Sequence, residues 1–571
     1  MRSTVDGGPR YKWIALSNTT LGVLIATMDA SIVIISLPAI FHGIGLDPLA
    51  AGNIGYLLWM ILGYLLVSAV LVVVLGRLGD MFGRVRIYNL GFLIFAVASV
   101  ALSLDPFTGG GGAMWLILWR VVQAFGGSMI TANSAAILTD AFPPGQRGMA
   151  LGVNQITALA GQFLGLLAGG LLAAVDWRAV FWVSVPLSVA GTVWSYLSLR
   201  ETASGRRGRI DWLGNVTFAA GAGILLAGIT YGIQPYDGGA TGWGNPKVLA
   251  GLFGGVLLLA VFCVVEVRAA EPMFKLALFR MRAFAAGNLA ALLTAIARGG
   301  LQFMLIIWLQ GIWLPLHGYA FEDTPLWAGI FMLPLTFGFL VAGPLSGYLS
   351  DRFGARLFST TGLVVVACSF VGLLLLPVNF DYTAFALLLL LNGLGQGMFS
   401  SPNTSSIMGS VPPEHRGVAS GMRSTFQNSG TALSIGVFFS LMVSGLASSL
   451  PATLSGGLQA NGVPADTAHR VASLPPVSTL FATFLGDNPI RHLLGAETLS
   501  GLTAAQRDTL TGSGFFPGLV SGPFHHGLVI VFGVAAGMAL ISAVASALRG
   551  RHRPAGLRQE AAEPLGRAGR G

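Results

Sequence analysis

Three charged residues lie inside long apolar stretches of the chain and are the first candidates for chemistry: Asp29, Arg120 and Arg298. A charge deep in apolar surroundings is costly unless it is paired or hydrated, so each is interpreted as functional. Asp29 is the candidate proton carrier, and its pKa would depend on burial and on Arg120, which is expected at a similar depth. We expect the two to pair directly or through Gln123. A permanent ion pair that only locks two helices together is the alternative.

Uncharged polar residues in the same apolar stretches could line a substrate cavity. The candidates are Gln123, Asn133, Asn154, Gln155, Gln162, Gln302, Gln310, Asn392 and Gln396. A single polar residue of this kind more often forms a hydrogen bond between helices, so both roles stay open.

No pattern in the sequence is typical of catalysis or of cofactor binding. Metal-ligand spacings are absent, and the glycine run Gly109–Gly112 lacks the Lys and Ser/Thr of a phosphate-binding loop. We therefore expect no catalytic residue, no metal and no cofactor, and the chain is not expected to be an enzyme.

The elements that position these residues must be membrane helices. Of the 571 residues, 54% are hydrophobic and only 10% are charged, whereas soluble domains carry about 25% charged residues. The mean hydropathy is +0.74. Because a membrane-spanning helix needs about 20 apolar residues, we predict an all-α polytopic protein with fourteen spans. They are 13–40, 54–75, 87–104, 113–139, 148–174, 178–199, 212–233, 248–267, 284–313, 325–349, 357–377, 383–408, 417–446 and 523–548.

The distribution of basic residues predicts the topology. With the N-terminus placed in the cytoplasm, 25 Lys and Arg residues fall on the cytoplasmic side and five on the other side. This asymmetry predicts a cell (inner) membrane protein with both termini cytoplasmic. It also accounts for the net charge of +9 without a nucleic-acid partner.

Two regions are expected outside the membrane. Residues 447–521 are predicted to form a long extracytoplasmic loop, in which Val477–Leu485 would be a short helix on the membrane surface. The tail 549–571 is rich in Arg, Gly and Ala, and we expect it to be disordered and to touch anionic lipids.

The chain contains an internal repeat. The segment 141–148 recurs 269 residues later at 410–417, and 76–84 recurs at 347–355 with an offset of 271. Spans 1–6 thus correspond to spans 9–14, an arrangement typical of transporters with a substrate site between two halves. The predicted divisions are a six-helix bundle at 1–200, two inserted helices at 201–282, a second six-helix bundle at 283–548 and the tail at 549–571. The 269-residue offset places Arg298 at the position of Asp29.

Four motifs accompany these features. A loop pattern comprises Gly76, Asp80, Gly83, Arg84 and Arg86, and it is repeated as Gly347, Asp351, Arg352 and Gly354. Span 4 carries Arg120, Gln123 and Gly126. Span 5 carries Gly152, Gly161, Gly165, Gly169 and Gly170, and span 1 carries Met28–Val33 followed by Leu37 and Pro38. The glycines of span 5 would allow another helix to approach closely.

With these motifs the chain resembles the major facilitator superfamily, specifically its fourteen-helix drug/proton antiporters (EmrB/QacA type). The resemblance implies proton-coupled multidrug export of amphipathic or cationic compounds by alternating access, by a monomer. It also implies that the two repeated loops are conformational latches. Met81 stands where the first latch usually has a basic residue, whereas Arg352 keeps that residue in the second, so the first is expected to be weaker.

One departure from the family pattern leaves an alternative function open. Leu166 stands directly after Gly165, where the antiporters have proline. A lipid or lipid-like substrate transporter, or flippase, of the same fold is therefore the second hypothesis, and a sensor or scaffold without transport is the third.

Overall fold

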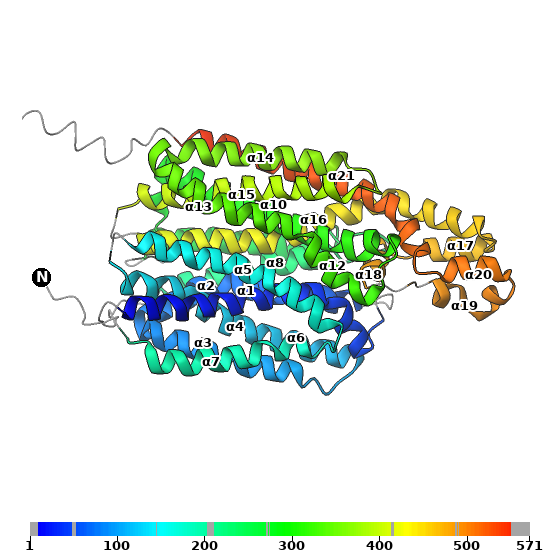
Figure 1. The fold of residues 1–571 in the computed structure, drawn as a ribbon, viewed down its shortest axis with the longest axis horizontal. Coiled ribbons are helices and arrows are strands. Elements are labelled where there is room, and N and C mark those ends of the chain that lie inside the picture. The colour runs from blue at the N-terminus through cyan, green and yellow to red at the C-terminus, as the bar shows by residue number, and fades with distance from the viewer. Residues whose placement is uncertain are drawn as a thin grey trace, which may run out of the picture.

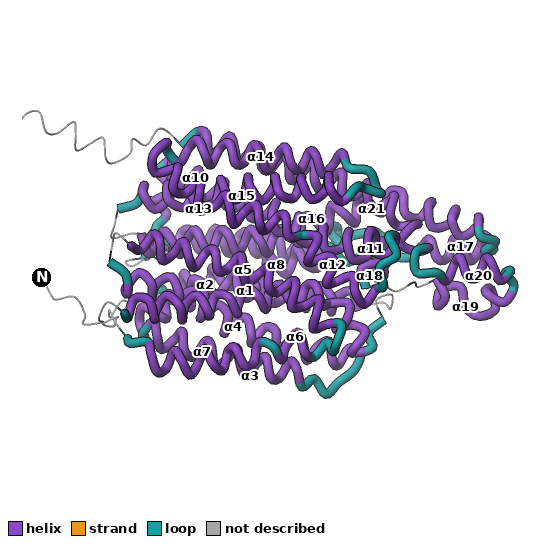
Figure 2. The backbone as a smooth tube through the Cα atoms, viewed as in Figure 1, coloured by secondary structure: helices purple, strands orange, loops and turns teal. Residues whose placement is uncertain are grey.

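The computed structural model describes residues 10–47, 53–143, 146–201, 211–269, 272, 274–412, 416–485, 488 and 490–549. These residues form helices joined by short loops (Figure 2). Fourteen helices among them are long and apolar enough to cross a membrane, which confirms the predicted all-α class and number of spans. Most of the predicted tail, residues 550–571, lies outside the described residues.

Seven helices form the first half, with the sixth span divided between α6 and α7. They are α1 (Tyr11–Ile44), α2 (Asn53–Phe82), α3 (Arg84–Ser103), α4 (Gly109–Ala141), α5 (Arg147–Ala173), α6 (Ala179–Trp182) and α7 (Ser184–Ser198). The spans α8 (Trp212–Gly232) and α9 (Pro246–Arg268) follow and pack against each other, and α8 also packs on α2 and α16.

The second half begins after the short helix η2 (Leu276–Arg280). Its helices are α10 (Arg282–Trp308), the π-helical turn η3 (Leu309–Trp313), α11 (Leu314–Leu316), η4 (Phe321–Asp323), α12 (Thr324–Phe331), α13 (Leu333–Phe353), α14 (Ala355–Leu375), α15 (Tyr382–Ser410), α16 (Arg416–Ala460) and α21 (Phe515–Ala547). In Figure 1 the two halves lie one above the other with their helices parallel to the long axis.

Side-chain caps begin several of these helices. Asp211 accepts a hydrogen bond from the backbone N–H of Gly214 at the start of α8. Asn245 caps α9, which has Pro246 in its first turn, and Asp381 caps α15. Such caps satisfy backbone N–H groups that have no partner within the helix. They fix where each span begins.

Glycines allow α5 to pack closely on α1. A Cβ atom at Gly161 would lie 2.8 Å from the carbonyl oxygen of Leu24, and one at Gly169 would lie 2.8 Å from that of Ile32. Gly165 faces the carbonyl oxygen of Met28 in the same way. Gly170 instead meets Leu326 of α12, across the boundary between the halves. The predicted packing role is wrong for Gly152, where a Cβ would meet no atom within 4 Å.

The segment predicted as an extracytoplasmic loop at 447–521 is largely helical. The helix α16 continues to Ala460 and α21 starts at Phe515, so both extend into the predicted loop. Between them lie α17 (Ala465–Ala472), α18 (Pro476–Phe484), α19 (Ile490–Ser500) and α20 (Ala504–Thr511). Figure 1 shows α17, α19 and α20 projecting from the end of the bundle opposite the N-terminus.

The helix α18 does not lie on the surface, so that prediction is wrong. Each of its residues is buried, and it contacts α2 of the first half as well as α16, α21 and η3 of the second. The ring of Phe481 stacks on Phe439 with centroids 5.2 Å apart. A short apolar helix can lie equally well on the membrane surface or in a protein interior. Here α18 lies between the two halves.

The two ends of the bundle differ. At the end that carries α17–α20, here called the closed end, one hydrophobic core contains residues 32–46 of the first half and 296–314 of the second. At the opposite end, here called the Tyr11 end, the core around Tyr88 and Phe92 draws only on the first half. The core around Phe284 and Ile407 joins the second half to α8 and α9.

The burial of the side chains of α5 also increases from the Tyr11 end toward the closed end. Gln155 and Ile156 are exposed, whereas Leu166 and Gly169 are buried. The described residues therefore form a helical bundle whose halves share a core at the closed end.

Candidate functional site

A buried polar network lies within the first half. Asp29 on α1 and Arg120 on α4 form an ion pair in which both side chains are almost completely buried. Gln123, one turn after Arg120, donates from Nε2 to Asp29 Oδ1 at 2.9 Å and accepts from Arg120 Nη1 at 2.6 Å. The structure thus brings together the three residues that the sequence singled out in spans 1 and 4.

Three residues of this network were not predicted. Ser99 on α3 accepts a hydrogen bond from Gln123 at 2.9 Å, and the hydroxyl of Ser184 on α7 lies 3.5 Å from Asp29 Oδ1. The guanidinium carbon of Arg120 lies 4.3 Å from the centre of the Tyr64 ring on α2. Serine and tyrosine are common in membrane helices, so no sequence signal marked them.

The second half has a neutral counterpart of this network. Asn392 donates to Ser369 Oγ at 2.7 Å, and Gln396 donates to Asn392 Oδ1 at 2.9 Å. By the repeat offset of 269, Asn392 occupies the position of Gln123 and Leu389 that of Arg120. The charged part of the network therefore belongs to the first half alone.

Arg298 does not occupy the position of Asp29, and that prediction is wrong. A Cβ at Gly161 approaches the carbonyl oxygen of Leu24, and a Cβ at Gly430 approaches that of Leu292 at 2.9 Å. The equivalent contacts on α1 and α10 are thus 268 residues apart, which aligns Asp29 with Ala297 and Arg298 with Ala30. One residue turns a helix by about 100°, so Arg298 points to a different side of α10.

The other polar candidates divide into helix-joining residues and residues with open surface. Asn133 donates to the carbonyl oxygen of Met129 at 2.8 Å and to that of Leu75 on α2 at 3.5 Å. Gln310 donates to the carbonyl oxygen of Ile35 at 3.4 Å and so joins the halves at the closed end. Gln155 is exposed, Gln162 and Gln302 are half-buried, and Asn154 is buried with an unpartnered Oδ1 atom.

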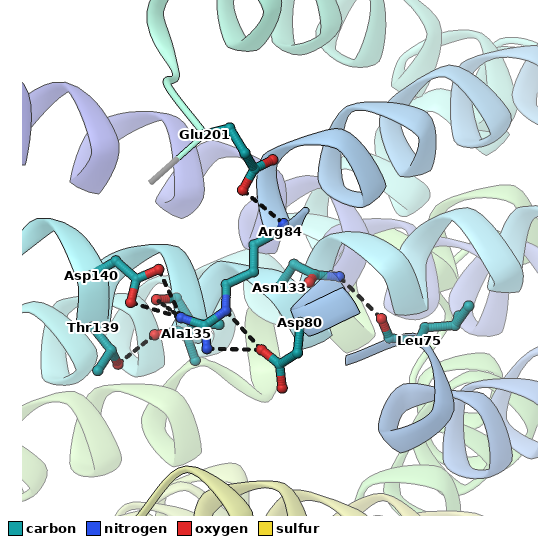
Figure 3. Close-up of polar contacts among 9 residues, drawn as sticks. Leu75, Asp80, Arg84, Asn133, Ala135, Thr139, Asp140 and Glu201 are labelled. Atoms are coloured by element: carbon teal, nitrogen blue, oxygen red, sulfur yellow. Dashed lines mark hydrogen bonds and ion pairs between the residues drawn. The ribbon is translucent and has the colours of Figure 1, made fainter. Parts of the chain in front are cut away.

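The first repeated loop forms a charged cluster at the Tyr11 end. Arg84 bonds to Asp80 at 2.8 Å and to Asp140 at the end of α4 at 2.7 Å (Figure 3). Glu201, which no sequence motif marks, accepts from the backbone N–H of Arg84 at 3.0 Å (Figure 3). The backbone N–H groups of Val85 and Arg86 also donate to Glu201, so one carboxylate caps the start of α3. Arg86 itself is exposed.

Glycines shape both loops in the same way. Gly83 has φ +108° and Gly354 has φ +91°, values that only glycine adopts readily. Gly76 packs on Ala132, and Gly347 packs on Ser401 at the equivalent place.

The second loop is described only in part. Arg352 is exposed and its guanidinium lies 5.5 Å from the ring of Phe353, without an ion pair to any described residue. The side chain of Asp351 is outside the described part. In the first loop Asp80 and Asp140 supply Arg84 with carboxylates, and Met81 is not needed for that contact. Which of the two loops is the stronger latch stays a prediction.

Two halves of repeated topology, two further spans and a charged network buried inside the helices define a secondary transporter. Within the described ranges, no three His, Cys, Asp or Glu side chains are placed to bind a metal ion. The sequence model of the Major Facilitator Superfamily matches residues 19–435. The chain belongs to this superfamily and is a multi-pass membrane protein.

Several known proteins are similar to this chain. The Tetracenomycin C resistance and export protein of Streptomyces glaucescens is 29% identical over 566 residues, covering 98% of this chain and 96% of that protein. The methyl viologen resistance protein SmvA of Salmonella typhimurium is 30% identical over 81% of this chain and 90% of its own. The riboflavin transporter RibZ of Clostridioides difficile is 27% identical over 76% of this chain and 90% of its own.

Solved structures show the same fold. A bacterial homolog of the human lysosomal transporter Spinster, in an inward-facing and unoccupied conformation, aligns with a TM-score of 0.53 at 17% identity, covering 96% of this chain and all of that one. An auto-inhibited POT family peptide transporter aligns with a TM-score of 0.55 at 13% identity, covering 84% of this chain and 96% of its own.

Proposed function

We propose that this protein is a proton-coupled exporter of amphipathic small molecules in the cell membrane, with both termini in the cytoplasm. The observation that carries the proton coupling is the ion pair of Asp29 and Arg120, which is buried in the first half. Relatives named for resistance or export, such as the tetracenomycin C protein, support a drug-like substrate. The relatives reported above give no support to lipid transport.

The network suggests how a proton acts. Ionised Asp29 accepts bonds from Arg120 and Gln123 and so joins α1 to α4. Protonation removes the charge that holds Arg120, and the guanidinium then needs another partner or water. The contact between α1 and α4 weakens, which shifts the first half toward a second arrangement.

The closed end defines what must move for release to the outside. The helix α18 fills the space between the halves there, and α5 contacts α12 where Gly170 meets Leu326. In the proposed cycle the substrate enters from the Tyr11 end. The halves then separate at the closed end, and α18 leaves α2 while it remains attached to the second half through Phe439.

The decisive experiment is transport in proteoliposomes with an imposed pH gradient, using anionic and cationic fluorescent amphiphiles. Wild-type protein is expected to accumulate substrate against its gradient. Asp29→Asn is expected to lose this accumulation and yet to exchange substrate down its gradient, because Asn, like protonated Asp29, carries no charge and cannot release a proton. Asp381→Asn is the matched control, since Asn also caps a helix. Gradient-driven transport that is unchanged in Asp29→Asn would disprove the role of Asp29.

A further inference from the structure

Two arginines inside the spans α10 and α16 have no carboxylate partner among the described residues. Asp29 is neutralised by Arg120. Arg298, near the middle of α10, makes no hydrogen bond or ion pair with any residue that the structure describes. Arg423 on the adjacent α16 bonds only to the amide oxygen of Gln427, at 3.3 Å. The uncompensated charge on these two packed helices is positive.

Arg298 is one of the few residues that are not fully buried in an otherwise buried stretch of α10. From Thr294 to Leu314 each residue is buried except Arg298, Gly299 and Gln302. A lipid-facing side would recur at every turn through this stretch, because a helix repeats every 3.6 residues. A single gap halfway along the span instead indicates a local space inside the protein.

The gap lies beside the sides of α10 that pack against the rest of the protein. Arg298 corresponds to Ala30 on α1, one position beyond the residue that faces the interior of its own half. On α10, Ala295 and Gly299 contact Gly430 and Ser434 of α16, while Ala290 and Leu301 belong to buried cores. Arg298 and Gln302 stand one turn apart beside these packed sides, and both point the same way.

The guanidinium nitrogens of Arg298 keep some accessible surface. None of them is among the buried nitrogen atoms that lack a partner, although the side chain makes no bond. An arginine held in apolar surroundings needs water or an anion to offset its lost hydration. Its planar fork of N–H donors fits carboxylate, sulfonate and phosphate oxygens, and the Gln302 amide adds a donor beside it.

We propose that Arg298, with Gln302, binds the anionic group of an amphipathic substrate, so that the exporter favours organic acids over cations. The inference rests on the proposed export function and narrows its substrate class. Asp29 does not offer a competing site for cations while Arg120 and Gln123 occupy its oxygens.

The test compares fluorescein, an anion at neutral pH, with rhodamine 6G, a cation built on the same xanthene ring. Both are assayed in proteoliposomes under the same pH gradient. Wild-type protein is expected to transport fluorescein faster than rhodamine 6G. Arg298→Gln is expected to lower fluorescein transport about tenfold or more, because a charge-assisted hydrogen bond is lost. Arg298→Lys should restore part of it, and Gln302→Leu should cause a smaller loss.

The outcomes separate this proposal from the export function. Arg298→Gln breaks no bond to a described residue, so its thermal stability should match wild type and its rhodamine 6G transport should not fall. Gradient-driven transport of rhodamine 6G alone, or equal losses for both dyes in Arg298→Gln, would overturn the substrate class and leave export standing. If neither dye moves in wild-type protein, the proposed export function itself fails.

Discussion

The imidazole Nε2 of His42, near the end of α1, lies 3.1 Å from the backbone carbonyl oxygen of Leu485, directly after α18. The first helix of the first half thus holds the helix that fills the closed end. Since Phe481 of α18 stacks on Phe439 of α16, the same short helix is held from both halves.

Replacing His42 should loosen α18. His42→Ala removes its hydrogen bond to Leu485, and the loss of this bond, about 1 kcal/mol, corresponds to about a fivefold shift in an equilibrium. A cysteine placed at the buried position Thr483, in a protein whose Cys263 and Cys368 are replaced by serine, should react about fivefold faster with a membrane-impermeant maleimide. A cysteine at the exposed Ala505 should react equally fast with and without His42. Equal reactivity of the Thr483 cysteine in both proteins would contradict this role.

A covalent link across the closed end should stop transport. A Cβ at Gly329 of α12 would lie 3.6 Å from the Leu167 side chain of α5. Cysteines at these two positions should form a disulfide under oxidation and abolish transport, and a reductant should restore it. A variant with only one of the two cysteines should remain active under the same oxidising conditions. Full activity of the cross-linked protein would rule out separation of the halves at this end.

The pair of Asp29 and Arg120 should be strongly coupled energetically. Arg120→Gln leaves the buried carboxylate without its cation and should cost roughly 3–5 kcal/mol. The double variant Asp29→Asn/Arg120→Gln should lose less stability than the sum of the single variants, because no unpaired charge remains. Thermal unfolding in detergent measures all four proteins. Additive losses would show that the two side chains are independent.

The two repeated loops should differ in their contribution. Arg84→Ala removes the contacts to Asp80 and Asp140, whose side chains are partly exposed, so each pair contributes about 0.2–1 kcal/mol. The conformational equilibrium should shift by up to about thirtyfold if both pairs contribute fully, with a corresponding fall in transport rate. Arg352→Ala is the matched control and should have a smaller effect, since Arg352 only stacks on Phe353. A larger effect at Arg352 would show that its loop is bonded mainly in another conformation.

Helix packing offers a matched pair of glycines. Gly165→Ala would push a methyl group toward the carbonyl oxygen of Met28 and should destabilise the protein by about 1–3 kcal/mol. Gly152→Ala meets open space on the same helix and should be neutral or slightly stabilising, because alanine favours helix. Thermal unfolding measures the stability of the two variants. A loss of stability in Gly152→Ala equal to that in Gly165→Ala would contradict the packing argument.

The sequence predicted the parts of this protein that depend on rare residues. Charges are scarce in apolar spans, so Asp29 and Arg120 stood out, and the repeat revealed the halves. Ser99, Ser184 and Glu201 carry no such signal, because hydroxyl and loop carboxylate residues occur in many roles.

Two errors have physical causes. The position of Arg298 depended on a repeat offset that changes by a single residue, and a single residue rotates a helical side chain by about 100°. The nine residues of α18 are too few to span a membrane. Their apolar composition could not distinguish lipid from the space between two halves, which only the tertiary structure determines.

The length of α16 gives the protein an outward-reaching rod. Its 45 residues span about 68 Å at 1.5 Å per residue, more than twice the roughly 30 Å thickness of a bilayer core. A tilt of 10° about its far end would displace the tip of such a helix by about 12 Å. A fluorophore on α17, which packs on α16, would therefore magnify motions within the membrane into a signal that can be followed one molecule at a time.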